Sequence, residues 1–160
     1  MVEIRRAAYD DGPALAAIDR ATWSPLVSPA PPPPGDRPFF AEDDEPANLL
    51  VAADDGEVVG YVMVHQWSRM PSHGHVLEIN GLAVDPSHQG RGLGRALVLA
   101  AQEETRRRGA RKLTLRVLAP NTPARTLYES CGFVVEGTLR GEFELDGALV
   151  DDVLMAWFAD

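Results

Sequence analysis

One stretch of this chain decides its fold: Leu82-Ala83-Val84-Asp85-Pro86-Ser87-His88-Gln89-Gly90-Arg91-Gly92-Leu93-Gly94-Arg95-Ala96-Leu97. An apolar run with strand character ends at Asp85-Pro86, and a glycine-rich loop then leads into an apolar helical segment. Glycine lacks a Cβ, so its backbone can approach a bulky anion closely and adopt a positive φ at low cost. The first N–H groups of a helix lack intrahelical partners and lie at the positive end of its dipole. The stretch therefore predicts a binding site for a phosphate or pyrophosphate.

Length and composition are typical of a single globular domain. The chain has 160 residues, of which 45% are hydrophobic and 24% charged, so we expect one domain over residues 1–160. No window supplies the roughly 20 consecutive apolar residues of a membrane helix, and no secretory signal is evident, so no membrane association is expected. A net charge of −9 argues against nucleic-acid binding. Cys131 is the only cysteine, which favours a reducing, cytoplasmic location.

Hydrophobic periodicity and turn residues predict strands that alternate with helices. Helices are expected after the first strand and at 92–108 and 124–130, and strands at 2–6, 48–53, 57–66, 75–84, 112–118, 133–145 and 148–158. This order predicts an α/β (α+β mixed) fold with helices packed on the faces of a sheet. A proline-rich loop is expected at about 24–46 and ends in the acidic run 42–45. Whether this loop is a mobile surface segment or a substrate lid stays open, although its acidic run would suit a cationic amine.

Three kinds of anion-binding loop compete for the glycine-rich segment. A P-loop requires Gly-Lys-Ser or Gly-Lys-Thr at the helix start, whereas residues 94–96 are Gly-Arg-Ala. A dinucleotide-binding loop requires Gly-x-Gly-x-x-Gly and an acid about 20 residues later. Residues 90–94 have the wrong glycine spacing, and residues 110–114 contain no acid. The remaining pattern is Gln-x-x-Gly-x-Gly, which is formed by Gln89, Gly92 and Gly94.

This pattern closely resembles the acetyl-CoA motif of the GNAT superfamily of N-acetyltransferases. Leu-Ala-Val-Asp-Pro at 82–86, Asn121, and Leu-Tyr-Glu-x-x-Gly-Phe at 127–133 are also similar to that superfamily, in its usual order. The resemblance covers about residue 57 to the C-terminus, and the first strand and helix more loosely. It implies a mixed, largely antiparallel sheet of about seven strands, splayed between the fourth and fifth and flanked by about four helices.

The resemblance also implies an acetyl-CoA-dependent N-acyltransferase. Such an enzyme transfers acetyl from acetyl-CoA to a primary amine of a small molecule or a protein N-terminus, by direct attack in a ternary complex. The alternative is a catalytically inactive domain on the same scaffold that only binds or senses acyl-CoA. A nucleotide-binding fold is a third, weaker alternative. The long final hairpin offers an edge through which a homodimer could form.

Main-chain groups are expected to make most of the coenzyme contacts. The pyrophosphate would be held by backbone N–H groups of Gly90, Arg91, Gly92, Leu93, Gly94 and Arg95. The pantetheine arm and the thioester oxygen would bond to the main chain of Leu82, Ala83 and Val84. Gln89 is expected to shape the loop, and Asn121 either bonds the pantetheine amide or only caps the next helix.

Basic side chains are concentrated near the proposed anion loop in the sequence. Arg91 and Arg95 could add charge to the pyrophosphate site or remain exposed. They belong to a larger group that predicts a local positive field: Arg91, Arg95, Arg106, Arg107, Arg108, Arg111 and Lys112.

Tyr128 and Glu78 are the catalytic candidates. Tyr128 matches the family's acid position, where a phenol can hydrogen-bond or protonate the leaving thiolate; otherwise it packs the short helix onto the sheet. Glu78 matches the position at which histone-type members carry a general-base glutamate, acting directly or through water. It could instead bind the amine electrostatically or face solvent without a role.

No metal site is expected. The four histidines are expected in exposed loops, although His75 could relay a proton, and no carboxylate framework surrounds them. Cys131 has no activating base nearby in the sequence and is expected to pack in the core.

Overall fold

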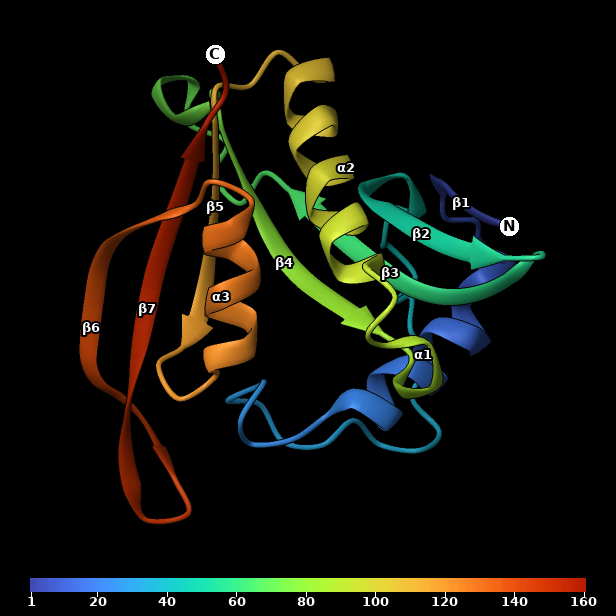
Figure 1. Cartoon of the computed structure of the whole chain (residues 1–160), viewed down its shortest axis with the longest axis horizontal. Coiled ribbons are helices and arrows are strands. Elements are labelled where there is room, and N and C mark those ends of the chain that lie inside the picture. Colours follow the sequence, from blue (N-terminus) through green and yellow to red (C-terminus); the bar gives the residue numbers. More distant parts are fainter.

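The computed structural model describes residues 1–160 and contains one seven-stranded mixed sheet with three α-helices (Figure 1). The order of strands in the sheet is β1-β2-β3-β4-β5-β7-β6, and every neighbouring pair is antiparallel except β4 and β5. The helices are α1 (Gly12–Thr22), α2 (Leu93–Arg107) and α3 (Thr122–Ser130). The strands are β1 (Val2–Arg6), β2 (Leu49–Asp54), β3 (Glu57–His65), β4 (Val76–Val84), β5 (Lys112–Leu118), β6 (Val134–Leu145) and β7 (Ala148–Phe158). None of the helices is long and apolar enough to cross a membrane.

The helices bury two separate cores on opposite faces of the sheet. On one face, Leu15 and Ile18 of α1 pack against Val51 of β2. On the other face, the apolar side of α2 and the residues around α3 pack on the central strands, with Leu97 and Leu113 fully buried. Alternate residues of β3 and β4 therefore point to different cores, as strand geometry requires.

The sheet opens between its two parallel strands. β4 pairs with β5 only over Val76–Ile79, although both strands continue beyond the paired segment. The register between β3 and β4 shifts at the same place, because Met63 pairs with Gly81 while Val64 pairs with Ile79. Asn80 is left as the extra residue of a β-bulge, and a bulge bends its strand and increases the local twist. The two strands consequently diverge toward their C-terminal ends (Figure 1), which confirms the predicted splay between the fourth and fifth strands.

The number of α-helices is three, not the roughly four that the resemblance implies. Residues 23–45, between α1 and β2, contain turns and bends but no helix. Seven prolines lie within residues 23–45 of this proline-rich loop. Proline lacks the N–H of a helical hydrogen bond and its ring clashes with the preceding turn. The composition that predicts a loop here therefore also explains why a helix is missing; four short 3-10 helices occur elsewhere in the chain.

A buried carboxylate joins the start of the sheet to the end of α2. Glu104 is 5% exposed and accepts hydrogen bonds from the guanidinium groups of Arg6, Arg107 and Arg108 at 2.7 to 3.0 Å. Arg107 contributes most to lowering the pKa of Glu104, which falls from 4.5 to about 2 despite the opposing effect of burial. Glu104 therefore stabilises the fold as a carboxylate.

Replacing Glu104 is expected to destabilise the protein in a pH-dependent way. Glu104→Gln should lower the free energy of unfolding by about 2 kcal/mol at pH 7, because charged hydrogen bonds are lost. Since the folded-state pKa is depressed, this contribution is present above pH 4.5 and disappears as the pH falls toward 2. Urea denaturation from pH 7 to 3 should show the two proteins converging. Glu103→Gln, at a neighbouring exposed position, is the control and should change stability by less than about 0.5 kcal/mol; equal losses in both variants would contradict the assignment.

Candidate active site

The loop after β4 presents unpaired amides to open space. Gly90 and Gly92 both have φ of +79°, and a Cβ built at either would meet no atom within 4 Å. The first hydrogen bond of α2 runs from the N–H of Ala96 to the carbonyl of Gly92. The N–H groups of Leu93 and Gly94, in the first turn, are therefore without helical partners. A loop of this shape can bind an anion through its main chain.

Gly94 has a different role from the other two glycines. Its φ is not positive, and a Cβ there would lie 3.3 Å from the Cδ2 atom of Leu127. Gly94 therefore allows α2 and α3 to pack closely, in addition to offering its N–H to the loop. Gln89 donates a hydrogen bond from Nε2 to the carbonyl of Val84 at 3.1 Å, which ties the loop to the end of β4.

The prediction that seven basic residues cluster around the anion-binding loop is wrong for most of the seven. α2 has 15 residues and is about 22 Å long, so the basic residues at 106–112 lie at the end of the helix away from the loop. Only Arg91 and Arg95 lie near the anion site. Arg95 donates hydrogen bonds to the carbonyl and hydroxyl of Ser130 at 3.1 and 3.2 Å, so it also anchors the end of α3.

The gap between β4 and β5 exposes strand edges to a ligand. Leu82, Ala83 and Val84 pair with β3 on one side but have no partner strand on the other. All three are only partly buried, although they lie in the middle of the sheet. Asn121 begins α3, and its side-chain oxygen accepts a hydrogen bond from the N–H of Ala124 at 3.3 Å. Asn121 therefore caps α3 through its side-chain oxygen, and its amide nitrogen remains available for another partner.

Tyr128 lies in α3 with its ring almost fully buried. The ring packs edge-on against Phe133, with 5.8 Å between ring centroids, and 7% of the residue is exposed. The hydroxyl oxygen has no hydrogen bond within the protein and is not sealed from solvent. Burial, assisted by the nearby Cys131 thiol, raises the pKa of Tyr128 to about 12. The phenol therefore keeps its proton at neutral pH and can donate a hydrogen bond.

Glu78 faces the α1 side of the sheet and has a partner that the sequence does not indicate. Its Oε1 atom lies 3.1 Å from the Nε2 atom of His65, which stands directly opposite in the register of β3 and β4. The side chains are 22% and 28% exposed, respectively. His65 is the last residue of β3, within the strand expected at 57–66, and it is partly buried instead of exposed. His75, in contrast, is exposed and lies just before β4.

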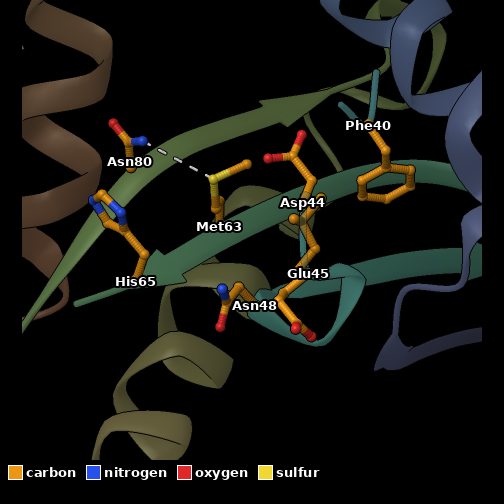
Figure 2. A pocket seen from close by; sticks show the side chains of 8 residues that line it. Phe40, Asp44, Glu45, Asn48, Met63, His65 and Asn80 are labelled. Atoms are coloured by element: carbon orange, nitrogen blue, oxygen red, sulfur yellow. Dashed lines mark hydrogen bonds between the residues drawn. The ribbon is translucent and has the colours of Figure 1, made fainter. Parts of the chain in front are cut away.

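A cavity of about 200 Å³ opens beside this pair. Figure 2 shows side chains from β3, from β4 and from the end of the proline-rich loop pointing into the same space. Its apolar part is formed by Phe40, Leu49 and Met63, and its polar part by Asp44, Glu45, Asn48, His65 and Asn80. No lysine or arginine lines it, and neither acid forms an ion pair. The cavity is consequently suited to a cation.

The other two histidines and the cysteine make contacts within the protein outside the cavity. His73 packs edge-on against Trp67, and His88 bonds to the hydroxyl of Ser87. No group of three or more histidine, cysteine or acidic side chains is placed to hold a metal ion. Cys131 is buried in the larger core.

The open strand edge and the free helix amides together form a site suited to a ligand that has an anionic group and an extended arm. A family model described as "Acetyltransferase (GNAT) family" matches residues 14–133. The chain therefore belongs to the GNAT family of acetyltransferases.

Relatives of this chain carry several different names. It is 32% identical over 138 residues to aminoglycoside N(6′)-acetyltransferase type 1 of Stenotrophomonas maltophilia, covering 81% of this chain and 84% of that relative. It is 42% identical over 89 residues to mycothiol acetyltransferase of Beutenbergia cavernae, covering 56% of this chain. The match spans only 29% of that longer relative. YncA from Salmonella typhimurium, solved with its cofactor acetyl-CoA, superposes with a TM-score of 0.83 at 25% identity, covering 100% of this chain and 95% of that one.

Two features of the structure show that these residues could hold acetyl-CoA. Open space adjoins the amides at Gly90 and Gly92, where a pyrophosphate needs close backbone approach. The unpaired edge of β4 offers main-chain donors and acceptors to an extended arm, as a missing strand would.

Replacing Gly92 is expected to weaken acetyl-CoA binding. An alanine at φ of +79° costs about 1–2 kcal/mol, and relief of that strain moves the N–H groups that follow. Gly92→Ala should raise the Kd for acetyl-CoA roughly tenfold by calorimetry. Gly35→Ala, at an open position without a positive φ, is the control. An unchanged Kd in a folded Gly92→Ala protein would show that these amides do not bind the cofactor.

Proposed function

We propose that this protein transfers an acetyl group from acetyl-CoA to a primary amine that carries further positive charge, by direct attack in a ternary complex. The observation that carries the proposal is the joint presence of an unpaired β4 edge and an acidic cavity beside it. Acetyl-CoA supplies the activated acetyl group as a thioester. Holding both reactants in one site replaces an encounter in solution, and such positioning accounts for much of the rate enhancement in enzymes of this kind.

The coenzyme side of the site uses main chain more than side chains. We assign the pyrophosphate to the amides of 90–95 and the pantetheine arm to the backbone of 82–84, with the amide nitrogen of Asn121 as a further donor. This assignment is supported by the positive φ values in the loop and by the missing strand partner. Arg91 has no ion-pair partner in the protein and is free to add charge to the pyrophosphate site.

Tyr128 supplies the hydrogen-bond donor for the leaving sulfur. A free thiol has a pKa of about 8.5, whereas that of Tyr128 is about 12. Complete transfer of the phenol proton to a thiolate is therefore uphill by roughly 5 kcal/mol. Tyr128 accordingly stabilises the negative charge through its O–H group, and the sulfur obtains its proton finally from the reacting nitrogen or from water.

The acceptor enters from the α1 face of the sheet. Glu78 lies on this face, and its partner His65 lines the acidic cavity. An acceptor ammonium must lose a proton before it can attack, and we assign this base function to the Glu78 carboxylate or a group that it orients. Asp44 and Glu45 hold a second positive charge of the acceptor. Because these acids belong to the proline-rich loop, the loop takes part in acceptor binding.

Removing the Tyr128 hydroxyl is expected to affect turnover and not cofactor binding. Tyr128→Phe keeps the ring packed on Phe133, so the Kd for acetyl-CoA should be unchanged while kcat falls about a hundredfold. With its pKa raised to about 12, the phenol stays protonated up to about pH 10. The wild-type rate should therefore rise from pH 7 to 10 as the amine deprotonates, without a loss due to Tyr128. Wild-type turnover in the phenylalanine variant would remove the hydroxyl from the mechanism.

The decisive experiment is an amine panel followed by release of the CoA thiol. Alkyl diamines should be better acceptors than monoamines of the same length, because only diamines fill both the reaction centre and the acidic cavity. Amino acids and peptide N-termini complete the panel. Tight acetyl-CoA binding without thiol release on any amine would instead establish a sensing domain and overturn the proposal.

The charge of the cavity can be tested with one neutralised acid. Glu45→Gln should raise the KM for a diamine about fivefold and leave kcat unchanged, since it removes one exposed ionic contact. Glu42→Gln is the control, because Glu42 is exposed in the same loop but does not line the cavity. The same KM for both variants would mean that the cavity does not bind the acceptor.

A further inference from the structure

His65 has one ring nitrogen bound and the other free. Nε2 lies 3.1 Å from the Oε1 atom of Glu78. A carboxylate only accepts hydrogen bonds, so in the neutral ring this contact requires the hydrogen on Nε2 and leaves the lone pair on Nδ1. Nδ1 has no protein partner and is not sealed from solvent. The imidazole therefore has an oriented basic nitrogen that remains available to a ligand.

The location of this nitrogen is the acidic cavity. His65 lines the cavity together with Asn80, the bulge residue of β4, and Figure 2 draws both among the lining side chains. Glu78 does not line the cavity itself. An amine held in the cavity therefore meets the imidazole before it meets the carboxylate.

Imidazole is also the better chemical match for the task. In model peptides an imidazole titrates near pH 6.5 and a carboxyl near 4.3, and a general base works best when its pKa lies near the working pH. A carboxylate that holds the opposite ring nitrogen fixes the tautomer and stabilises the imidazolium that forms. The His65–Glu78 pair supplies both an imidazole and a carboxylate bound to its opposite ring nitrogen.

We propose that His65 is a catalytic residue, whose Nδ1 takes a proton from the acceptor ammonium while Glu78 orients the ring through Nε2. This proposal deepens the proposed function and rests on it. The ammonium becomes a neutral amine, and His65 becomes an imidazolium paired with the Glu78 carboxylate. The amine nitrogen then forms its bond to the acetyl carbon as the bond between that carbon and sulfur breaks. Of the two protons that the nitrogen loses, one leaves through His65 to solvent, and the other ends on sulfur.

The charged groups that face His65 are mainly acids. Glu78 faces the ring from β4, and Asp44 and Glu45 face the same cavity from the proline-rich loop. Arg108, the residue that follows α2, donates a hydrogen bond to the carbonyl of Val64 in β3 at 3.2 Å. Its guanidinium is also bound to Glu104, so its charge is largely compensated.

The test compares His65→Gln with the wild type over a range of pH. Glutamine can still donate a hydrogen bond to Glu78, but it has no basic nitrogen. At pH 7 the kcat/KM for the best amine of the panel should fall at least tenfold, with an unchanged Kd for acetyl-CoA. The loss should shrink as the pH approaches 10, because free amine is then already present in solution. His75→Gln removes an exposed histidine away from the cavity and should match the wild type throughout.

Two further measurements separate this proposal from a purely structural role. Added imidazole should restore activity to His65→Ala at pH 7, and it should not restore activity to Tyr128→Phe. If His65→Gln keeps the wild-type kcat/KM at pH 7, His65 is not the base, while acetyl transfer itself still stands on release of CoA. If the loss in His65→Gln is the same at every pH and imidazole rescues nothing, the ring has only a packing role and the proposal fails.

Discussion

The constraint on which the rest of the site depends is that β4 keeps one neighbour along its length and loses the other halfway. β3 follows β4 to its end, whereas β5 leaves it after Ile79. The bulge at Asn80 coincides with this point, so the strand can turn away without breaking its pairing with β3. The bulge leaves one edge of β4 unpaired, and the glycine-rich loop begins where the same strand ends. Glu78 lies two residues before the bulge residue and pairs with His65 of β3. On the proposed function, one local irregularity thus brings the coenzyme side and the acceptor side of the site to a single strand.

Local signals in the sequence predict the elements well, because each element depends on its own residues. The predicted strands and the two later helices begin and end within about two residues of those in the structure, since glycine, proline and Asp-Gly turns mark their ends. The seven-stranded sheet and its splay come from the family resemblance. The missing helix between α1 and β2 could have been anticipated from proline alone. Its absence is a direct consequence of the chemistry of that ring.

Features that depend on register or on distance along a helix are not readable from residue order. His65 and Glu78 are 13 residues apart and meet only because of the pairing of β3 with β4. The basic residues near 106–112 look close to the loop in the sequence, but a rigid helix carries them to its other end. Gly94 belongs to the same motif as Gly92, yet it serves helix packing because a helix lies against it. In each case a neighbour far away in the sequence sets the role of a residue.

The attachment of the proline-rich loop has a consequence for how this protein can evolve. The loop is held mainly by aromatic packing: Phe39 lies edge-on to Tyr61 of β3 with ring centroids 5.3 Å apart, and Phe40 lies similarly against Tyr9 at 5.6 Å. The acids at its end make no ion pair that would constrain them. Substitutions of those acids leave the aromatic packing of the loop in place, whereas any side chain added at Gly90 or Gly92 must adopt a positive φ. On the proposed function, the acceptor side of the site can therefore change while the coenzyme side stays the same.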